Sequence, residues 1–166
     1  SSLKKVEQYS GRLKNNNPKR IAVISECLQK EGLDKEINLA IINQIEKLKQ
    51  KGHQVEEVTF PYLDYLVPTY YVISTAEASS NLARFDGVHY GYRSEKSDNT
   101  ESTYLITRTE GFGKEVQRRI MLGTFVLSAG YHDAYYTKAQ KMRRIIQDKT
   151  KEILSEYDFI LTPTTP

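Results

Sequence analysis

The sequence predicts an α/β fold in which a small sheet is covered by helices. Three short runs rich in β-branched and aromatic residues are typical of strands, and they lie at about 20–27, 53–60 and 158–163. The long segments between these runs place apolar residues at helical spacing. Hydrophobic residues make up 39% of the 166 residues and charged residues 27%, a balance typical of a globular domain rather than a disordered chain.

The first two predicted strands flank a predicted helix over residues 35–51. Asp34 stands where an N-cap is needed, and Gly52 stands where many helices end in the left-handed conformation. An apolar stripe at helical spacing gives this helix one core-facing side: Ile37, Ala40, Ile41, Ile45 and Leu48. A strand, a helix and a second strand in this order are typical of a parallel pair joined by a right-handed crossover.

The middle of the chain is predicted to be mostly helical. The predicted helices span residues 68–83, 103–109, 114–129 and 135–157, with an ordered loop at 84–93 and an exposed polar segment at 94–101. The first of these helices carries small side chains that allow another backbone to approach closely: Ser74, Ala76, Ala78 and Ser79. This helix therefore has room for the close approach of another segment of the chain.

Both ends of the sequence lead us to expect a piece of a longer domain. The chain has no initiator methionine, and its polar residues 1–17 are interpreted as a surface segment without the apolar stretch of a signal peptide. It stops directly after a short, continuously apolar strand of the kind found inside sheets. No run of about 18 apolar residues occurs, so we expect no membrane-spanning helix.

Few residues have the spacing that common catalytic or metal sites need. Cys27 is the single cysteine, and with no histidine near it in the sequence we interpret it as an inert buried thiol. His53, His89 and His132 lack metal-ligand spacing and are interpreted as structural or surface residues. The glycines and lysine at 111–114 are better explained by a turn before a helix than by a phosphate loop. The net charge of +3, spread along the chain, permits but does not require an acidic partner such as RNA.

Two features of the middle segment point to a binding site. Tyr70 and Tyr71 are adjacent, which suits either core packing or contact with a ligand. Arg118 and Arg119 interrupt an otherwise apolar helix, and an arginine is costly to bury without an anionic partner. Adjacent helical residues point about 100° apart, so one arginine can face solvent while the other faces inward. An inward arginine suits a substrate carboxylate or an internal ion pair, and the spacing favours neither.

Four longer motifs resemble a known family. They lie at residues 74–88 (STAEASSNLARFDGV), 108–123 (RTEGFGKEVQRRIMLG), 128–136 (SAGYHDAYY) and 161–166 (LTPTTP). On these motifs the chain resembles the amidase-signature family, and within it the A subunits of glutamyl-tRNA(Gln)/aspartyl-tRNA(Asn) amidotransferases. The resemblance implies the amidase-signature fold with a mixed sheet. It also implies that residues 1–166 form a single partial domain, from the central to the C-terminal part, without the N-terminal catalytic portion and the extreme C-terminus.

The resemblance further implies an activity, a complex and a location. Members of this branch hydrolyse glutamine with a Ser–cis-Ser–Lys triad and pass the ammonia to a B subunit. That subunit uses ATP and Mg²⁺ to convert Glu-tRNA(Gln) to Gln-tRNA(Gln), Asp-tRNA(Asn) to Asn-tRNA(Asn), or both. The implied partners are the B and C subunits, glutamine and, through the complex, misacylated tRNA, with no membrane and no cofactor held by this segment. The implied location is the bacterial cytoplasm, or an organelle in a eukaryote.

The resemblance assigns substrate binding rather than catalysis to this segment. It has no Gly-Gly-Ser-Ser-Gly-type stretch, so we expect no catalytic residue here and no activity of the segment alone. Tyr70 and Arg119 match the family residues that hold glutamine, with Arg119 on the α-carboxylate. An aspartate that receives the α-amino group lies beyond Pro166 in the family. Two alternatives stay open: a fragment of a stand-alone amidase of the same family, and a non-catalytic module that docks subunits or RNA.

Overall fold

The computed structural model describes residues 6, 9–12 and 17–164. The chain divides into two compact units, Ser1–Pro61 with Thr150–Pro166, and Tyr62–Lys149. The expected single partial domain stays a prediction. The predicted surface segment at 1–17 lies mostly outside the described residues, although Tyr9–Arg12 form a short 3₁₀ helix, η1.

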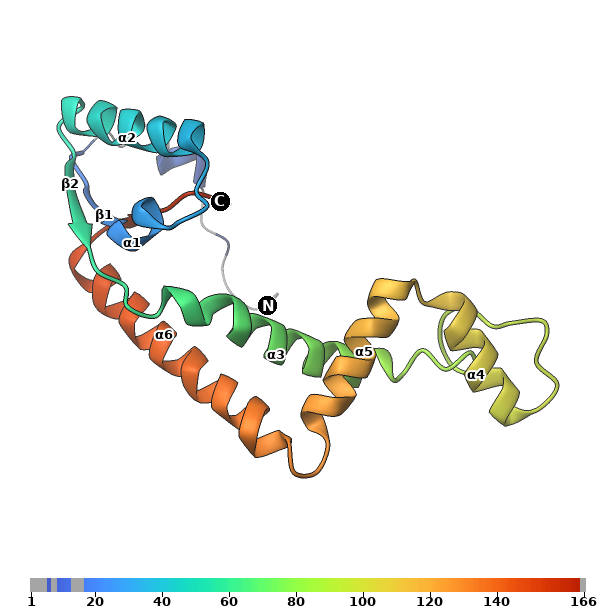
Figure 1. Ribbon diagram of the computed structural model, residues 1–166. Helices are drawn as coiled ribbons and strands as arrows, with labels where there is room; N and C mark the ends of the chain where they lie inside the picture. Colours follow the sequence, from blue (N-terminus) through green and yellow to red (C-terminus); the bar gives the residue numbers. More distant parts are fainter. Residues whose placement is uncertain (1–5, 7–8, 13–16, 165–166) are drawn as a thin grey trace. The chain divides into compact units, whose positions relative to one another are not determined.

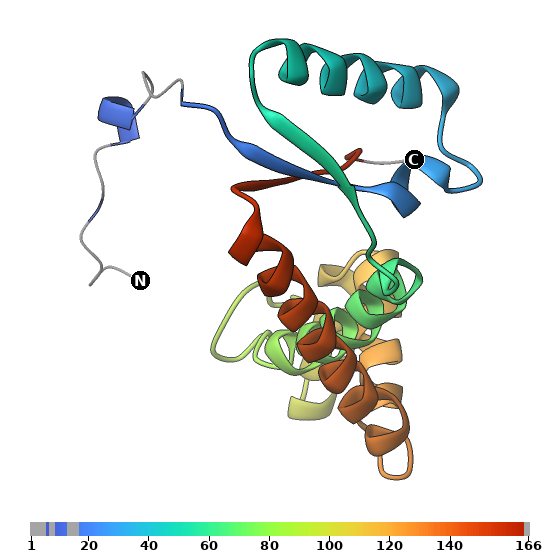
Figure 2. The same ribbon diagram turned by 90° about the vertical axis from the view of Figure 1, so that its left-hand side faces the viewer.

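The first unit is built on a three-stranded sheet (Figures 1 and 2). The strands are β1 (Arg20–Ile24), β2 (Gln54–Val58) and β3 (Phe159–Leu161), in the order β2-β1-β3. In the central strand, Ile21 pairs with Val55 on one side and with Phe159 on the other. The side chains of this strand form the core of the unit, with Ala22 0% and Val23 1% exposed.

The α/β fold class predicted from the sequence is confirmed, but the expected mixed strand directions are not found among the described strands. Both strand pairs, β1 with β2 and β1 with β3, are parallel. Parallel neighbours need a long crossover, and helices supply it before both β2 and β3. The observed strands are also each shorter at one or both ends than the predicted runs.

The central strand ends three residues before its predicted end at residue 27. Ser25–Gln29 form a short helix, α1, which places Cys27 on a helix rather than on a strand. The Glu26 carboxylate accepts the backbone N–H of Phe60 at 2.8 Å. The Phe60 N–H, just after β2, is thereby bonded to a side chain instead of to β1. The pairing of β1 with β2 ends at Ile24 and Val58, and the chain after Ile24 continues as a helix.

The helix predicted over residues 35–51 is confirmed as α2 (Lys35–Gln50), which lies over one face of the sheet (Figures 1 and 2). The Asp34 carboxylate caps it by accepting the N–H groups of Glu36 at 2.7 Å and Ile37 at 3.3 Å. Gly52 follows it at φ +86°, the left-handed conformation that glycine adopts without steric cost. The predicted apolar stripe is half-buried, apart from Ala40, which is exposed.

The second unit is helical. It contains α3 (Leu63–Leu82), α4 (Thr100–Gly111), α5 (Lys114–Leu127), the π-helix η2 (His132–Thr137) and the part of α6 (Lys138–Glu156) that ends at Lys149. α3 begins earlier than predicted, with Pro68 in its second turn rather than at its start. α4 also begins earlier, because Asn99 and Ser102 form a capping box in front of the predicted start.

The predicted continuous helix at 135–157 begins instead as the π-helix η2. Aromatic rings gather beside this irregular turn: the ring centroids of Phe125 and Tyr131 are 4.3 Å apart, and those of Phe125 and Tyr135 are 6.0 Å apart. The Thr137 hydroxyl also donates to the Asp133 carboxylate at 3.0 Å. None of the described helices is long and apolar enough to cross a membrane.

Candidate functional site

The candidate site lies where α3 crosses α5 (Figure 1). Ala76 of α3 is 2% exposed, and Gly123 of α5 packs directly on the backbone of α3. A methyl group added at Gly123 would overlap the carbonyl oxygen of Thr75 and lie 2.6 Å from the Cβ of Ser79. The hydroxyls of Ser79 and Thr124 complete the crossing with a 3.0 Å hydrogen bond. The close approach predicted from the small residues of α3 is confirmed.

The two arginines of α5 share one carboxylate next to this crossing. Arg119 donates from Nε to Glu115 Oε1 at 2.9 Å, and Arg118 contacts Glu115 Oε2 at 2.7 Å. The Arg119 side chain is 33% exposed and the Arg118 side chain 66%, so Arg119 is the more inward of the two. Hydrogen bonds from Arg118 and then Arg119 lower the pKa of Glu115, because both favour its ionised form.

Tyr70 of α3 lies against Arg119 of α5, which brings the two predicted site residues together. Glu115 and, second, the hydrogen bond with Tyr70 raise the pKa of the Arg119 guanidinium. Tyr70 is 58% exposed, and its ring meets that of Tyr71 edge-on with centroids 5.6 Å apart. The pair therefore combines a cation with a phenol hydroxyl on an accessible surface, an arrangement that suits an anionic group such as a carboxylate.

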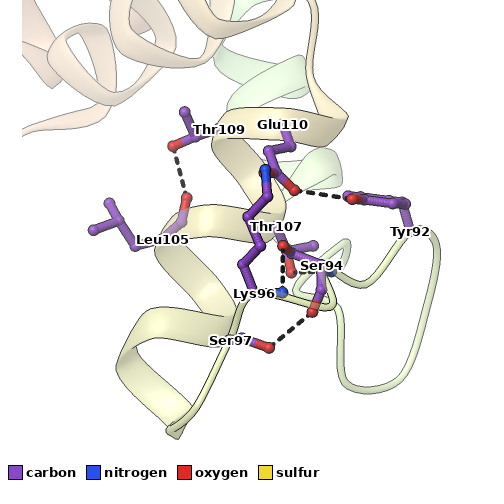
Figure 3. Close-up of polar contacts among 8 residues, drawn as sticks. All are labelled: Tyr92, Ser94, Lys96, Ser97, Leu105, Thr107, Thr109 and Glu110. Atoms are coloured by element: carbon purple, nitrogen blue, oxygen red, sulfur yellow. Dashed lines mark hydrogen bonds and ion pairs between the residues drawn. The ribbon is translucent and has the colours of Figure 1, made fainter.

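A second polar cluster fixes the loop before α4 to that helix, as Figure 3 shows. Lys96 Nζ and the Tyr92 hydroxyl bind the two oxygens of Glu110 at 2.7 and 2.9 Å. The Ser94 N–H donates to the Thr107 hydroxyl at 3.1 Å, and Ser94 is 2% exposed. The prediction that residues 94–101 are all exposed is therefore wrong at Ser94, because its polar groups find partners on α4. The Glu110 pKa falls to about 2, with the Lys96 hydrogen bond as the largest cause.

The remaining sequence candidates contribute no ligand set in the described part of the chain. Burial raises the pKa of the half-buried Cys27 thiol, which keeps it protonated and fits the interpretation of an inert thiol. His53 Nδ1 accepts the Lys19 N–H at 3.1 Å, while His89 and His132 each contact a neighbouring aspartate. Within residues 6, 9–12 and 17–164, no three His, Cys, Asp or Glu side chains gather as a metal site.

The comparison with protein families places the whole chain in one of them. Residues 1–166 match the Amidase family, and the chain belongs to it. This confirms the family and the fold that the four motifs indicate.

Individual relatives carry a more specific name. The A subunit of glutamyl-tRNA(Gln) amidotransferase from Fusobacterium nucleatum is 54% identical over 136 residues, which are 82% of this chain and 28% of the relative. The protein of the same name from Clostridium botulinum is 48% identical over 164 residues, 98% of this chain and 34% of the relative. The crystal structure of the corresponding protein from Thermotoga maritima matches at 39% identity and a TM-score of 0.57, over 88% of this chain and 26% of that one. The chain thus spans between about a quarter and a third of the length of these relatives.

Sequence reasoning missed Glu115, Gly123 and Glu110. Glu115 stands three and four positions before the two arginines, a helical spacing that predicts contact and could have identified it. Gly123 could have been matched to the small residues of α3 as the partner that they allow to approach. The link between Lys96 and Glu110 depends on the course of the loop, and the sequence carries no local signal for it.

Proposed function

We propose that this segment is part of the glutaminase subunit of a tRNA-dependent amidotransferase. The intact protein hydrolyses glutamine and supplies ammonia that converts Glu-tRNA(Gln) to Gln-tRNA(Gln), Asp-tRNA(Asn) to Asn-tRNA(Asn), or both. The observation that carries the proposal is the similarity to relatives that bear the amidotransferase name, in a chain where Arg119 is 33% exposed on the helix that packs against α3.

In this proposal the segment holds the substrate by its non-reacting end. The Arg119 guanidinium binds the α-carboxylate of glutamine through charge-assisted hydrogen bonds. Tyr70 interacts with that guanidinium and helps to keep it charged, as the raised pKa of Arg119 indicates. Since the α-carboxylate takes no part in amide hydrolysis, these contacts act alike on ground state and transition state and set the KM for glutamine rather than kcat.

In this proposal the residues that hydrolyse glutamine lie outside this segment. The Ser–cis-Ser–Lys triad of the family has no counterpart motif in residues 1–166, so the segment alone is expected to release no ammonia from glutamine. The ammonia passes to a B subunit, which binds ATP and Mg²⁺, and misacylated tRNA and a C subunit complete the assembly. A cytoplasmic location follows from this role.

Ammonia release from glutamine tests the proposal. A full-length protein that carries residues 1–166 should release ammonia from glutamine, whereas the segment of residues 1–166 should release none. With the B and C subunits, ATP, Mg²⁺ and misacylated tRNA present, nitrogen from ¹⁵N-amide glutamine should appear in the aminoacyl group. Turnover of other small amides without transfer to tRNA would instead identify a stand-alone amidase. Absence of glutaminase activity, together with capture of partner subunits by the segment, would identify a docking module.

A further inference from the structure

We propose that Glu115 is a positioning residue that fixes the Arg119 guanidinium in the orientation required for binding a carboxylate. The inference rests on the proposed function, because it concerns how the same site holds glutamine. Glu115 lies one helical turn before Arg119 on α5 and accepts a hydrogen bond from its Nε at 2.9 Å. It does not itself contact the substrate in this proposal.

Glu115 binds the Nε of Arg119, and this determines which donors of the guanidinium remain for a ligand. A guanidinium is a planar group with five N–H donors, one on Nε and two on each terminal nitrogen. A carboxylate that occupies Nε leaves the donors of the two terminal nitrogens available for other acceptors. The edge formed by these two nitrogens matches the two oxygens of a second carboxylate, which can bind in the bidentate manner.

The charges of the three side chains also favour an incoming anion. Without Arg118, the negative charge of Glu115 would cancel the positive charge of Arg119, and Glu115 would repel a substrate carboxylate. Arg118, however, contacts the other oxygen of Glu115 at 2.7 Å, so two guanidiniums share one carboxylate and the group keeps a net charge of about +1. Tyr70 bounds the guanidinium on the α3 side without adding charge. The lowered pKa of Glu115 agrees with a carboxylate that stays ionised between the two arginines.

The chain offers a matched example of a merely structural pair. Arg144 Nε contacts Asp148 at 3.0 Å on α6, also four residues apart, but the Arg144 side chain is 70% exposed. Such exposed helical pairs contribute little to stability. The Arg119 side chain is half as exposed, and it lies on the helix that packs against α3. Asp148 is therefore the control for Glu115.

The test is the steady-state kinetics of glutamine hydrolysis by the full-length protein in its complex. Glu115→Ala should raise the KM for glutamine by about three- to tenfold, the size of one ordinary hydrogen bond and less than the loss of Arg119 itself, and leave kcat within about twofold. Glu115→Gln keeps an acceptor for Nε and should raise the KM less. Asp148→Ala should leave both constants unchanged. The KM effect should vanish with 4-aminobutanamide, which is glutamine without its α-carboxylate.

A double-mutant cycle separates this inference from the proposed function. If Glu115 acts through Arg119, Glu115→Ala should add nothing to the KM of Arg119→Ala. An unchanged KM in Glu115→Ala, in a protein where Arg119→Ala raises it, would overturn the positioning role and leave the proposed function standing. An unchanged KM in Arg119→Ala would refute the substrate-binding assignment itself. Effects of the two substitutions that add fully would also overturn the positioning role.

Discussion

Replacing Gly123 by alanine perturbs the crossing of α3 and α5 that brings Tyr70 and Arg119 together. The added methyl group would overlap the carbonyl oxygen of Thr75 and approach the Cβ of Ser79 to 2.6 Å. Thr75 belongs to the backbone of α3, so the clash cannot be relieved by a change of rotamer. The two helices must separate, or one must shift along the other.

Two opposing effects set the size of the change. Overpacking a tight contact costs typically 1–3 kcal/mol, and a clash with backbone lies toward the upper end, about 3 kcal/mol. Alanine in a helix interior gains about 1 kcal/mol over glycine in intrinsic propensity. The structure therefore predicts a net loss of about 2 kcal/mol in the free energy of unfolding.

Urea unfolding followed by circular dichroism measures this difference. Gly113→Ala is the control, because Gly113 has φ −62° and nothing within 4 Å of an added methyl group. It stands at the N-cap of α5, where alanine is disfavoured, so its cost should stay at or below about 1 kcal/mol. Gly123→Ala with stability equal to or above that of the unsubstituted protein would refute the tight crossing, since only the propensity gain would then act.

Two further predictions concern the loop before α4 and the N-terminus of α2. Lys96→Ala should raise the pKa of the Glu110 carboxyl from about 2 toward its ordinary value of 4.5, as measured by ¹³C NMR titration, and an unshifted pKa would rule out the Lys96 contact. The pKa of Glu110 is lower in the folded than in the unfolded protein, so its ionised carboxylate adds to the free energy of unfolding fully above about pH 4.5, and this contribution is lost as the pH falls toward 2. In the Lys96→Ala variant this pH-dependent contribution should be smaller. Asp34→Ala removes the cap of α2 and should cost about 1 kcal/mol in urea unfolding, whereas Asp34→Asn should cost a few tenths.

The elements that the sequence predicted well are those with local signals. α2 was predicted nearly to the residue, because Asp34 and Gly52 act on backbone groups next to them. The end of β1 was missed because it depends on Glu26 and Phe60, which are 34 positions apart in the sequence. Ser94 was placed on the surface for the same kind of reason, since its partner Thr107 lies on another element. Contacts between distant segments leave no periodic pattern in the sequence.

The residues of the candidate site could be predicted from the family motifs. The ionic partner of its arginine was not predicted from the sequence. From the residues alone, the inward-facing arginine of the Arg118–Arg119 pair had two options, an internal ion pair and a substrate clamp, and the family resemblance selected Arg119. The structure gives Arg119 an ion pair through Nε with Glu115, and that contact does not use the terminal nitrogens. The two options are therefore compatible on one side chain, a result that the sequence spacing alone could not supply because it does not determine which nitrogen is engaged.

The most direct test of the account is the KM for glutamine of Arg119→Ala in the full-length protein, with Arg144→Ala as the control. Arg119→Ala should raise the KM by about tenfold to a hundredfold, as expected for the loss of charge-assisted hydrogen bonds to a carboxylate, while kcat falls little. Arg144→Ala should match the unsubstituted protein, since its partner Asp148 lies on the exposed surface of α6. An unchanged KM in Arg119→Ala, or an equal rise in both variants, would contradict the assignment of Arg119 to the glutamine carboxylate.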